Sequence, residues 1–311
     1  MKLNSCLVCS GYKSFLYSAF NLFAMKSKGV LILLISSLAY SGFVITNKRV
    51  LESGFSAFQF TFLMIAGLTL ISLFFIAKDF RLLKQMTVRE WVFVGLIGVL
   101  ASGFVQFLFV YGQKFTSALN AGFISTLSAP FTAILAVFLL NEELSLKRWV
   151  LASTSFLGII LLTTNLDVKG FSLGDGLILI AMALVAFTNV LAKLVMRRLN
   201  GLFVNALRHV FGFLFVFLTA LILGRLWAFS AVPAHLWPLL LASIGLTFIF
   251  LAFFYWGIQL TSPTIATVIG LSEILFTSLF AILFLGESLS SLQWAGGLVA
   301  AGAIAWFALA N

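Results

Sequence analysis

Charged residues are scarce in this sequence, since only 9% of its 311 positions are Asp, Glu, Lys or Arg. A soluble domain carries roughly a quarter charged residues, so an ordinary soluble domain is excluded. Intrinsic disorder is excluded too, because disordered chains are rich in charge and poor in apolar residues. Apolar residues instead make up 62% of the sequence, with 36 Phe and a mean hydropathy of +1.16. These values predict a protein whose main solvent is a lipid bilayer.

Cysteine and histidine are also rare. Cys6 and Cys9 form a single C-x-x-C, and His209 and His235 lie too far away in sequence to complete an obvious zinc site. We therefore expect no metal ion and no cofactor. The net charge of +10 does not indicate a nucleic-acid partner, because the basic residues gather at the ends of apolar runs, as they do in cytoplasmic loops.

Apolar runs of about 20 residues recur along the chain, each long enough to cross roughly 30 Å of hydrocarbon as a helix. We count ten, approximately Gly29 to Thr46, Phe55 to Ala77, Trp91 to Tyr111, Ser117 to Leu140, Trp149 to Thr164, Leu173 to Lys193, Leu202 to Gly224, Trp237 to Ile258, Thr264 to Leu285 and Leu292 to Leu309. The breaks between them are too short for a folded domain, and the longest, Lys78 to Glu90, is a charged connector. The sequence thus predicts an all-α integral membrane protein with ten transmembrane helices.

A shift of 145 residues reveals an internal repeat. Gly112 to Trp149 then matches Gly257 to Trp294 at 13 of 38 positions, and the shift also carries Lys48 onto Lys193. We therefore predict two five-helix repeats, residues 29–164 and 173–309, after an N-terminal arm of residues 1–28. For this arm, an amphipathic surface helix and an upstream extension without function are both open.

The odd number of spans in each repeat makes the second copy enter the membrane upside down relative to the first. Inverted repeats are typical of transporters, because two copies in opposite orientations can exchange conformations and open a central site to either side in turn. The count of Lys and Arg on alternate sides is 13 against 5, with Arg208 inside a span. This asymmetry predicts that both termini lie in the cytoplasm.

Several motifs resemble those of the EamA-type ten-helix transporters of the drug/metabolite transporter superfamily. They are Leu140-Asn141-Glu142-x-Leu144-Ser145, Leu285-Gly286-Glu287-x-Leu289-Ser290, Pro130 in the fourth span, Trp294-Ala295-Gly296-Gly297, and Asn189-Val190 in the sixth span. The resemblance covers about Lys28 to Leu309. It implies an exporter of amino acids, related metabolites or toxic compounds in the inner (plasma) membrane of a bacterium.

Two positions depart from the family pattern. Glu273-Ile274-Leu275 in the ninth span lacks the Pro that relatives often carry beside the acidic residue, and Met64 stands where many relatives have Arg. The first departure predicts a stiffer ninth helix. The second removes one candidate contact to a substrate.

Glu273 is the sharpest functional signal. It lies nine residues into a 22-residue span, about 13 Å deep at 1.5 Å per residue. An ionisable group at this depth usually faces a bundle interior or wet cavity and marks an ion or substrate path, although a structural ion pair is the alternative. The repeat places Ser128 at the matching position of the fourth span.

Arg208 and His209 lie about 9 Å into the seventh span from its cytoplasmic end. Arg208 has the reach to pair with Glu273 or to bind a carboxylate or phosphate of the substrate, and snorkelling to the surface is equally open. His209 is a candidate for titration near neutral pH or for a hydrogen-bonded interior position.

Uncharged polar side chains inside the spans complete the candidate site. Gln106, Asn189 and Tyr40 each need a partner, and both a substrate cavity and interhelical hydrogen bonds would supply one. Glu142 and Glu287 lie at helix ends beside water, so we expect them to cap the next helix rather than to line the path.

The leading hypothesis is a secondary transporter that works by alternating access on a small-molecule substrate, with protons as a candidate coupling ion. No G-x-x-x-x-G-K-[ST] is present to support ATP hydrolysis. A carrier or flippase for lipid-linked or nucleotide-linked sugars would need several inward-facing cations, and only Arg208 and Lys193 are available. An intramembrane enzyme is disfavoured, because H-E-x-x-H is absent and the one deep acid has no evident carboxylate partner. The oligomeric state is not indicated.

Overall fold

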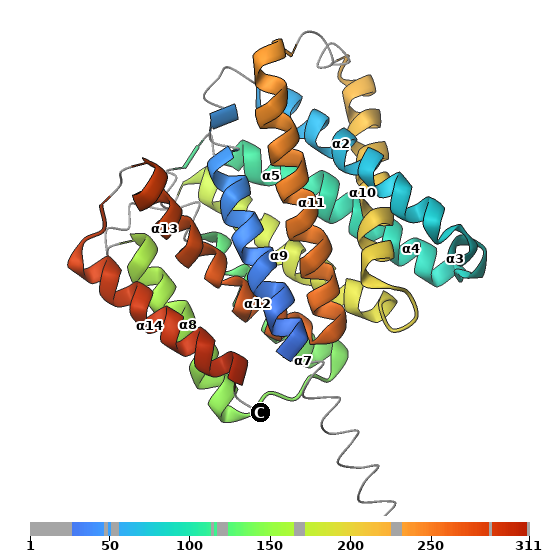
Figure 1. Ribbon diagram of the computed structural model, residues 1–311. Coiled ribbons are helices and arrows are strands. Elements are labelled where there is room, and N and C mark those ends of the chain that lie inside the picture. Colours follow the sequence, from blue (N-terminus) through green and yellow to red (C-terminus); the bar gives the residue numbers. More distant parts are fainter. Residues whose placement is uncertain are drawn as a thin grey trace, which may run out of the picture.

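The computed structural model describes residues 27–46, 49–50, 56–112, 115–116, 124–164, 172–224, 232–285 and 288–309. Regular structure across these ranges is helical throughout (Figure 1). Nine stretches in them are long and apolar enough to cross a membrane. The fourth predicted span appears as a shorter apolar helix, Ser128–Leu140, because part of the span lies outside the described residues. The predicted all-α membrane fold is therefore confirmed.

The helices follow the predicted spans closely. In chain order they are Ser27–Thr46, α2 (Ala57–Lys78), α3 (Phe80–Gln85), α4 (Val88–Ile97), the π-helix η1 (Gly98–Phe104), α5 (Val105–Gly112), α7 (Ser128–Leu140), α8 (Leu146–Thr164), α9 (Leu173–Val195), α10 (Gly201–Ile222), the short 3₁₀ helix η3 (Ala234–Leu236), α11 (Trp237–Leu260), α12 (Pro263–Gly270), α13 (Ser272–Leu285) and α14 (Ser291–Leu309). The charged connector contains α3, and the predicted N-terminal arm lies almost entirely outside the described residues.

Polar side chains fix where several helices begin. Thr87 and Glu90 form a capping box at α4, and Ser172 and Asp175 form another at α9. Each box supplies acceptors to backbone N–H groups that the first helical turn leaves free. Ser56 caps α2 and Ser262 caps α12 in the same way. Sequence thus determines the helix starts through capping, while the length of each apolar run determines how far the helix extends.

Contacts between the two repeats occur in equivalent pairs. Where a residue of the first repeat contacts one of the second, the two residues 145 positions away, in the other repeat each time, are also in contact. A Cβ on Gly257 would lie 2.4 Å from Leu33, and a Cβ on Gly112 would lie 2.7 Å from Ile178, the residue 145 positions after Leu33. Gly29 approaches Thr261 in the same manner as Gly174 approaches Thr116. Such reciprocal contacts arise only from a two-fold relation between the halves.

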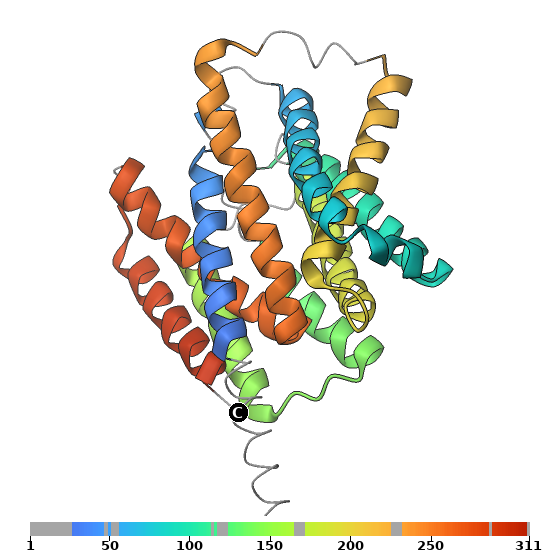
Figure 2. The ribbon, with the colours of Figure 1, turned by 45° about the vertical axis from the view of Figure 1, so that its right-hand side comes forward.

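The two halves run in opposite directions. In Figure 2, α2 descends from the top of the molecule while its counterpart α10 rises, and these two helices pack against each other. α8 and α14, the last helices of the two repeats, pack together along their length. The predicted arrangement of inverted repeats is thus present, with like helices meeting near the two-fold axis.

The fourth and ninth spans are both interrupted at equivalent positions. In the ninth, the Leu271 carbonyl accepts the Ile274 N–H at 3.2 Å, an i→i+3 bond between α12 and α13. In the fourth, Thr126 accepts the Ala129 N–H at 3.2 Å just before α7. The two bonds are equivalent, because Leu271 and Ile274 lie 145 positions after Thr126 and Ala129. A mid-helix 3₁₀ segment of this kind often marks a functional hinge.

This interruption occurs without a proline. The lack of proline beside Glu273 predicted a stiffer ninth helix, which stays a prediction, and the span is nonetheless interrupted, since α12 ends at Gly270 and α13 begins at Ser272. No proline lies at the break, and just after it Ser41 Oγ and Thr277 Oγ1 both donate to the Glu273 carbonyl, at 2.9 and 2.7 Å. Hydroxyl groups re-satisfy backbone groups in this way inside membranes.

Candidate functional site

Glu273 lies in the first turn of α13, directly after the interruption. Its backbone is tied to the first helix through Ser41, the residue that follows Tyr40. The Glu273 carboxylate has no hydrogen-bond partner or cation among the described residues, and the residue is only partly buried. Within the described ranges, then, Glu273 forms no structural ion pair.

Tyr40 is held in place by aromatic packing. Its ring meets Phe250 of α11 edge-on, with centroids 4.9 Å apart, and it contacts Phe43 at 5.9 Å. One turn away, Ser36 Oγ donates to the Phe250 carbonyl at 2.9 Å, so the first helix and α11 are joined at this level. Tyr40 thus precedes the residue that bonds the Glu273 backbone, and a site shared by Tyr40 and Glu273 stays a prediction.

Ser128 starts α7 at the position equivalent to Glu273, but it bonds locally. Its hydroxyl donates to the Ser125 carbonyl at 3.0 Å, and Thr132 donates to the Ser128 carbonyl at 2.7 Å, as Thr277 does to Glu273. The residues equivalent to Tyr40 and Ser41 are Val185 and Ala186. The fourth span therefore repeats the backbone of the ninth without its polar side chains.

A second group of polar residues lies on one face of α10. Asn205, Arg208 and His209 are spaced three and four residues apart, and all three are buried. Sequence reasoning missed Asn205. The signal that could have found it is its spacing of three and four residues from Arg208 and His209. Gly212 continues this face and allows η1 to approach, since a Cβ there would lie 2.3 Å from Ser102.

His209 bonds to α2. Its Nδ1 lies 2.9 Å from Ser72 Oγ, and Ser72 Oγ donates to the Leu68 carbonyl at 2.7 Å. Because a hydroxyl has one hydrogen, this geometry assigns the imidazole proton to Nδ1 and makes Nε2 an acceptor. Nε2 is sealed from solvent and has no partner among the described residues. His209 is thus a hydrogen-bonded interior residue with one ring nitrogen still unused.

Arg208 bonds to Tyr255 of α11 rather than to Glu273. Arg208 Nη1 donates to the Tyr255 hydroxyl at 2.8 Å, and the guanidinium carbon lies 4.8 Å from the centre of the Tyr255 ring. The side chain is 6% exposed, so it does not snorkel to the surface. Both expectations for Arg208, the pair with Glu273 and the surface position, are wrong in this conformation, since Tyr255 holds the guanidinium inside.

This face of α10 carries unused hydrogen-bonding atoms. Arg208 Nε, Asn205 Oδ1 and His209 Nε2 are each sealed from solvent without a partner in the described part of the chain. A buried cation without an anion is costly, and buried polar atoms are normally paired. Three such atoms on one helix face are therefore the pattern expected of a site that a ligand completes.

Asn189 and Gln106 have different surroundings. Asn189 is buried at 5% exposure on α9 and forms no hydrogen bond within the described residues, so it stays a candidate for the interior site. Gln106, on α5, is exposed. Its predicted place in a substrate cavity stays a prediction.

Glu142 joins the two repeats instead of capping α8. Its carboxylate accepts hydrogen bonds from Ser262 and, at 3.0 Å, from Thr264 Oγ1, both at the start of α12. The predicted contact with the next helix is replaced by one across the repeat boundary. Glu287, its counterpart, lies outside the described residues.

Lys193 closes the end of α11 near this contact. Its ammonium group donates to the carbonyls of Ile258, Gln259 and Thr261 at 2.7, 3.0 and 2.7 Å. All three donors of the ammonium are used, so Lys193 is not free to bind a phosphate. Cations at a helix C-terminus stabilise its unpaired carbonyls.

One short segment before α9 matches a sequence motif of serine hydrolases. Residues 170–174 read Gly-Phe-Ser-Leu-Gly and match the G-x-S-x-G pattern of serine nucleophiles. Ser172, however, is the N-cap of α9, and its Oγ accepts the Asp175 N–H at 3.2 Å. Ser172 therefore acts as a helix cap in the described part of the chain.

Two inverted five-helix repeats, interrupted at equivalent points and carrying a membrane-embedded acid, define an integral membrane transporter. Residues 27–164 and 172–309 each match the EamA-like transporter family. The chain belongs to this family.

Known proteins similar to this chain agree with that membership. It is 24% identical over 270 residues to an uncharacterized transporter of Clostridium kluyveri, covering 84% of this chain and 87% of the relative. An uncharacterized transporter of Methanothermobacter thermautotrophicus is 25% identical over 221 residues, covering 68% of this chain and 62% of that protein. A crystal structure superposes with a TM-score of 0.68 at 18% identity, covering 90% of this chain and 96% of its own, which supports the fold.

Proposed function

We propose that this transporter is a secondary carrier of small solutes that works by alternating access, and that it exports amino acids, related metabolites or toxic compounds. The observation that carries the proposal is the pair of equivalent interruptions in the fourth and ninth spans, with Glu273 in the first turn after one of them. Interrupted membrane helices at a repeat interface commonly form substrate and ion sites near the bilayer midplane.

Two groups of side chains divide the work in this proposal. Glu273 and Tyr40 exchange the coupling proton, while Arg208, His209 and Asn205 bind the anionic or polar part of the solute, with Asn189 as a further contact. Support comes from the free carboxylate of Glu273 and the unused atoms of α10. Ser128 supplies the matching position in the other repeat.

Both termini lie in the cytoplasm of a bacterium in this proposal, with the protein in the inner membrane. The described cations support it, since Lys28, Arg81, Arg89 and Arg198 are at one end of the helices and Arg49 is at the other. We call the end with these four residues the basic end. Reporter fusions at Lys84 and Lys169 should report opposite sides of the membrane, and the same side for both would refute this topology.

The test of transport begins with cells that overproduce the protein. An efflux and resistance screen across amino acids, their analogues and toxic compounds should yield solutes that the wild-type protein removes and an empty vector does not. The best hit is then used in liposomes that contain purified protein. Counterflow of the unchanged solute supports a carrier, whereas a converted product would indicate an enzyme and contradict the proposal.

A carrier for nucleotide-linked or lipid-linked sugars is the second candidate. The buried guanidinium of Arg208, which has no carboxylate partner among the described residues, favours an anionic substrate of this kind. Lys193 is engaged by three carbonyls, however, so the cluster of cations that a diphosphate needs is not assembled. Exchange of a nucleotide sugar, with no exchange of amino acids, would favour this candidate.

A further inference from the structure

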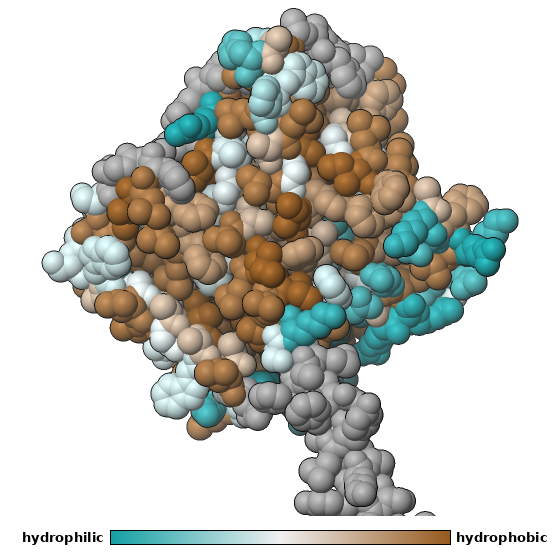
Figure 3. Space-filling view, in the orientation of Figure 1, coloured by the Kyte–Doolittle hydropathy of each residue, from teal (hydrophilic) through white to brown (hydrophobic). Residues whose placement is uncertain are grey.

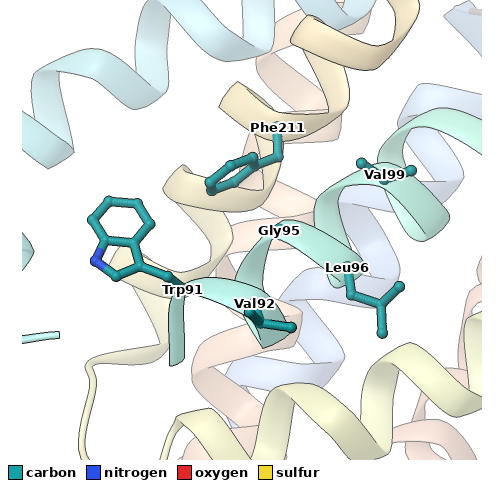
Figure 4. Close-up of a pocket in the computed structure, with 6 residues that line it drawn as sticks. All are labelled: Trp91, Val92, Gly95, Leu96, Val99 and Phe211. Carbon is teal, nitrogen blue, oxygen red and sulfur yellow. The ribbon is translucent and has the colours of Figure 1, made fainter. Parts of the chain in front are cut away.

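A groove opens on the outer surface of the bundle between α4 and α10. Its volume is about 580 Å³, and its lining residues are Trp91, Val92, Gly95, Leu96, Val99 and Phe211. All six are apolar or aromatic residues, and Figure 4 shows them arranged along α4, the start of η1 and the facing turn of α10. Val92 and Leu96 are 58% and 38% exposed. The groove therefore faces the hydrocarbon of the membrane rather than the interior of the protein.

Glycine shapes both ends of this groove. At Gly98 the helices are in backbone contact, since a Cβ there would lie 2.6 Å from the Arg208 carbonyl oxygen. One turn earlier the contact is looser, because a Cβ on Gly95 would lie 3.7 Å from the ring of Phe211, an ordinary contact distance. The rings of Trp91 and Phe211 meet edge-on at 6.2 Å. A slot of this kind accepts a flexible apolar chain that fills it along its length.

Exposed cations lie at the basic end, on the connector that leads into α4 and on the α9–α10 connection. We define the basic cluster as Lys78, Arg81, Lys84, Arg89 and Arg198. Arg89 precedes Trp91 by two residues, and Arg198 bonds Glu90 at 3.3 Å, which brings the α9–α10 connection against α4. Figure 3 shows hydrophilic side chains gathered over α3 beside the apolar surface.

The acidic residues within this region do not cancel its charge. Glu90 is held by its capping box with Thr87 and by Arg198, and Asp79 is the other acid between α2 and α4. Five cations against two acids leave a net positive mouth above an apolar slot. Clusters of four to eight Lys and Arg at the membrane surface attract anionic lipid head groups.

We infer that this groove is a binding site for an anionic phospholipid, with an acyl chain between Trp91, Leu96 and Phe211 and the phosphate at the basic cluster. The slot is apolar, so a free phosphate ion would use only the mouth, and a zwitterionic lipid would not match its charge. The indole of Trp91 sits where aromatic side chains favour the membrane–water interface. This inference stands independently of the proposed transport function.

Occupation of the site has a consequence for the neighbouring helices. The lipid chain contacts α4 and α10 together, one turn from the place where Gly98 meets the Arg208 carbonyl. A ligand that binds both helices in this packing stabilises it by mass action. The anionic lipid is therefore expected to raise the thermal stability of the purified protein.

Binding is tested with delipidated full-length protein in detergent by native mass spectrometry. Phosphatidylglycerol should bind more tightly than phosphatidylcholine of the same chain length and should raise the melting temperature. In the triple variant Arg81→Ala, Lys84→Ala, Arg89→Ala the affinity for phosphatidylglycerol should fall at least about tenfold, since each basic residue contributes a factor of roughly five near an anionic surface. The control Lys147→Ala, which removes an exposed cation stacked on Trp306, should leave it unchanged.

A second variant tests the slot itself. Gly95→Leu places a side chain in the groove without touching the basic cluster, and should lower lipid affinity while Gly302→Leu, at an open position on α14, does not. Equal affinity for both lipids, or full retention of phosphatidylglycerol by the triple variant, would overturn the inference. Competition by inorganic phosphate at equal strength would also overturn it, because it would reduce the site to an anion-binding mouth.

Discussion

The two repeats share one backbone design but differ in chemistry. Asn205, Arg208 and His209 on α10 correspond to Phe60, Leu63 and Met64 on α2, and Glu273 corresponds to Ser128. The contacts of Gly212 and Gly67 nonetheless place both helices against their neighbours in the same way. The backbone is thus symmetric, whereas Glu273, Arg208 and His209 all lie in the second repeat and only Tyr40, among the ionisable candidates, lies in the first. In the proposed mechanism the symmetric backbone would supply the two conformations and the asymmetric side chains would bind the solute.

The largest expected effect separates Glu273 from its counterpart. Glu273→Gln should reduce proton-coupled transport by about ten- to a hundredfold, because it removes a charged partner worth about 1.5–3 kcal/mol. Ser128→Ala should reduce it much less, since the Ser128 hydroxyl bonds within its own helix. Transport into liposomes is measured from pH 5.5 to 8.5 for both variants. Identical pH profiles for wild type and Glu273→Gln would remove the coupling role.

Arg208 offers the next test, because function and stability should move in opposite directions. Arg208→Met should weaken solute binding about tenfold or more, because a hydrogen bond to a charged group is worth about 1.5–3 kcal/mol. Its free energy of unfolding should stay equal or rise, since a buried cation without a carboxylate partner is unfavourable. Binding is measured by calorimetry and stability by thermal unfolding. The matched control is Leu63→Met, at the equivalent position on α2. A large loss of stability with retained binding in Arg208→Met would show that Arg208 is structural.

Close packing should also differ between the repeats. A Cβ on Gly212 would lie 2.3 Å from Ser102 Cβ and 3.1 Å from the Gly98 carbonyl, whereas a Cβ on Gly67 would meet the flexible end of Ile244 at 2.6 Å. Gly212→Ala should therefore cost about 1–3 kcal/mol of unfolding free energy, and Gly67→Ala less. Unfolding in detergent measures both. Equal losses would mean that Ser102 yields as easily as Ile244.

The smallest effect concerns the end of α11. Lys193→Met removes three hydrogen bonds to its terminal carbonyls and should lower the unfolding free energy by about 1–2 kcal/mol. Lys147→Met, an exposed cation over Trp306, should change it by less than about 0.5 kcal/mol. Thermal unfolding of the two variants gives the difference. A loss confined to Lys147→Met would contradict the capping role of Lys193.

Much of the fold follows from sequence because apolar run length is a strong constraint in a membrane. The spans, the 145-residue shift and the inverted halves all come from patterns spread over many residues, which local exceptions do not disturb. Glycine pairs such as Gly112 with Ile178 then agree with the shift residue by residue.

The site was less accessible to sequence because it depends on which residues face each other. Tyr255 lies 47 positions from Arg208, and nothing in its neighbourhood marks it as the partner of a buried guanidinium. Gln106 reads as an interior polar group from its place in the third span, yet its side chain is exposed. Glu142 reads as a helix cap, although Ser262 and Thr264 of the other repeat bind it.

The bend at Leu271 has a property that a proline bend would not have. Proline lacks the N–H that a continuous helix needs, so a proline break is permanent, whereas every residue from Leu271 to Leu275 keeps its amide hydrogen. Beside the bend, the hydroxyl of Ser41, on another helix, and that of Thr277 donate to the Glu273 carbonyl. A bend made without proline has no covalent obstacle to straightening, which would turn the acid to a new direction, or to forming again afterwards.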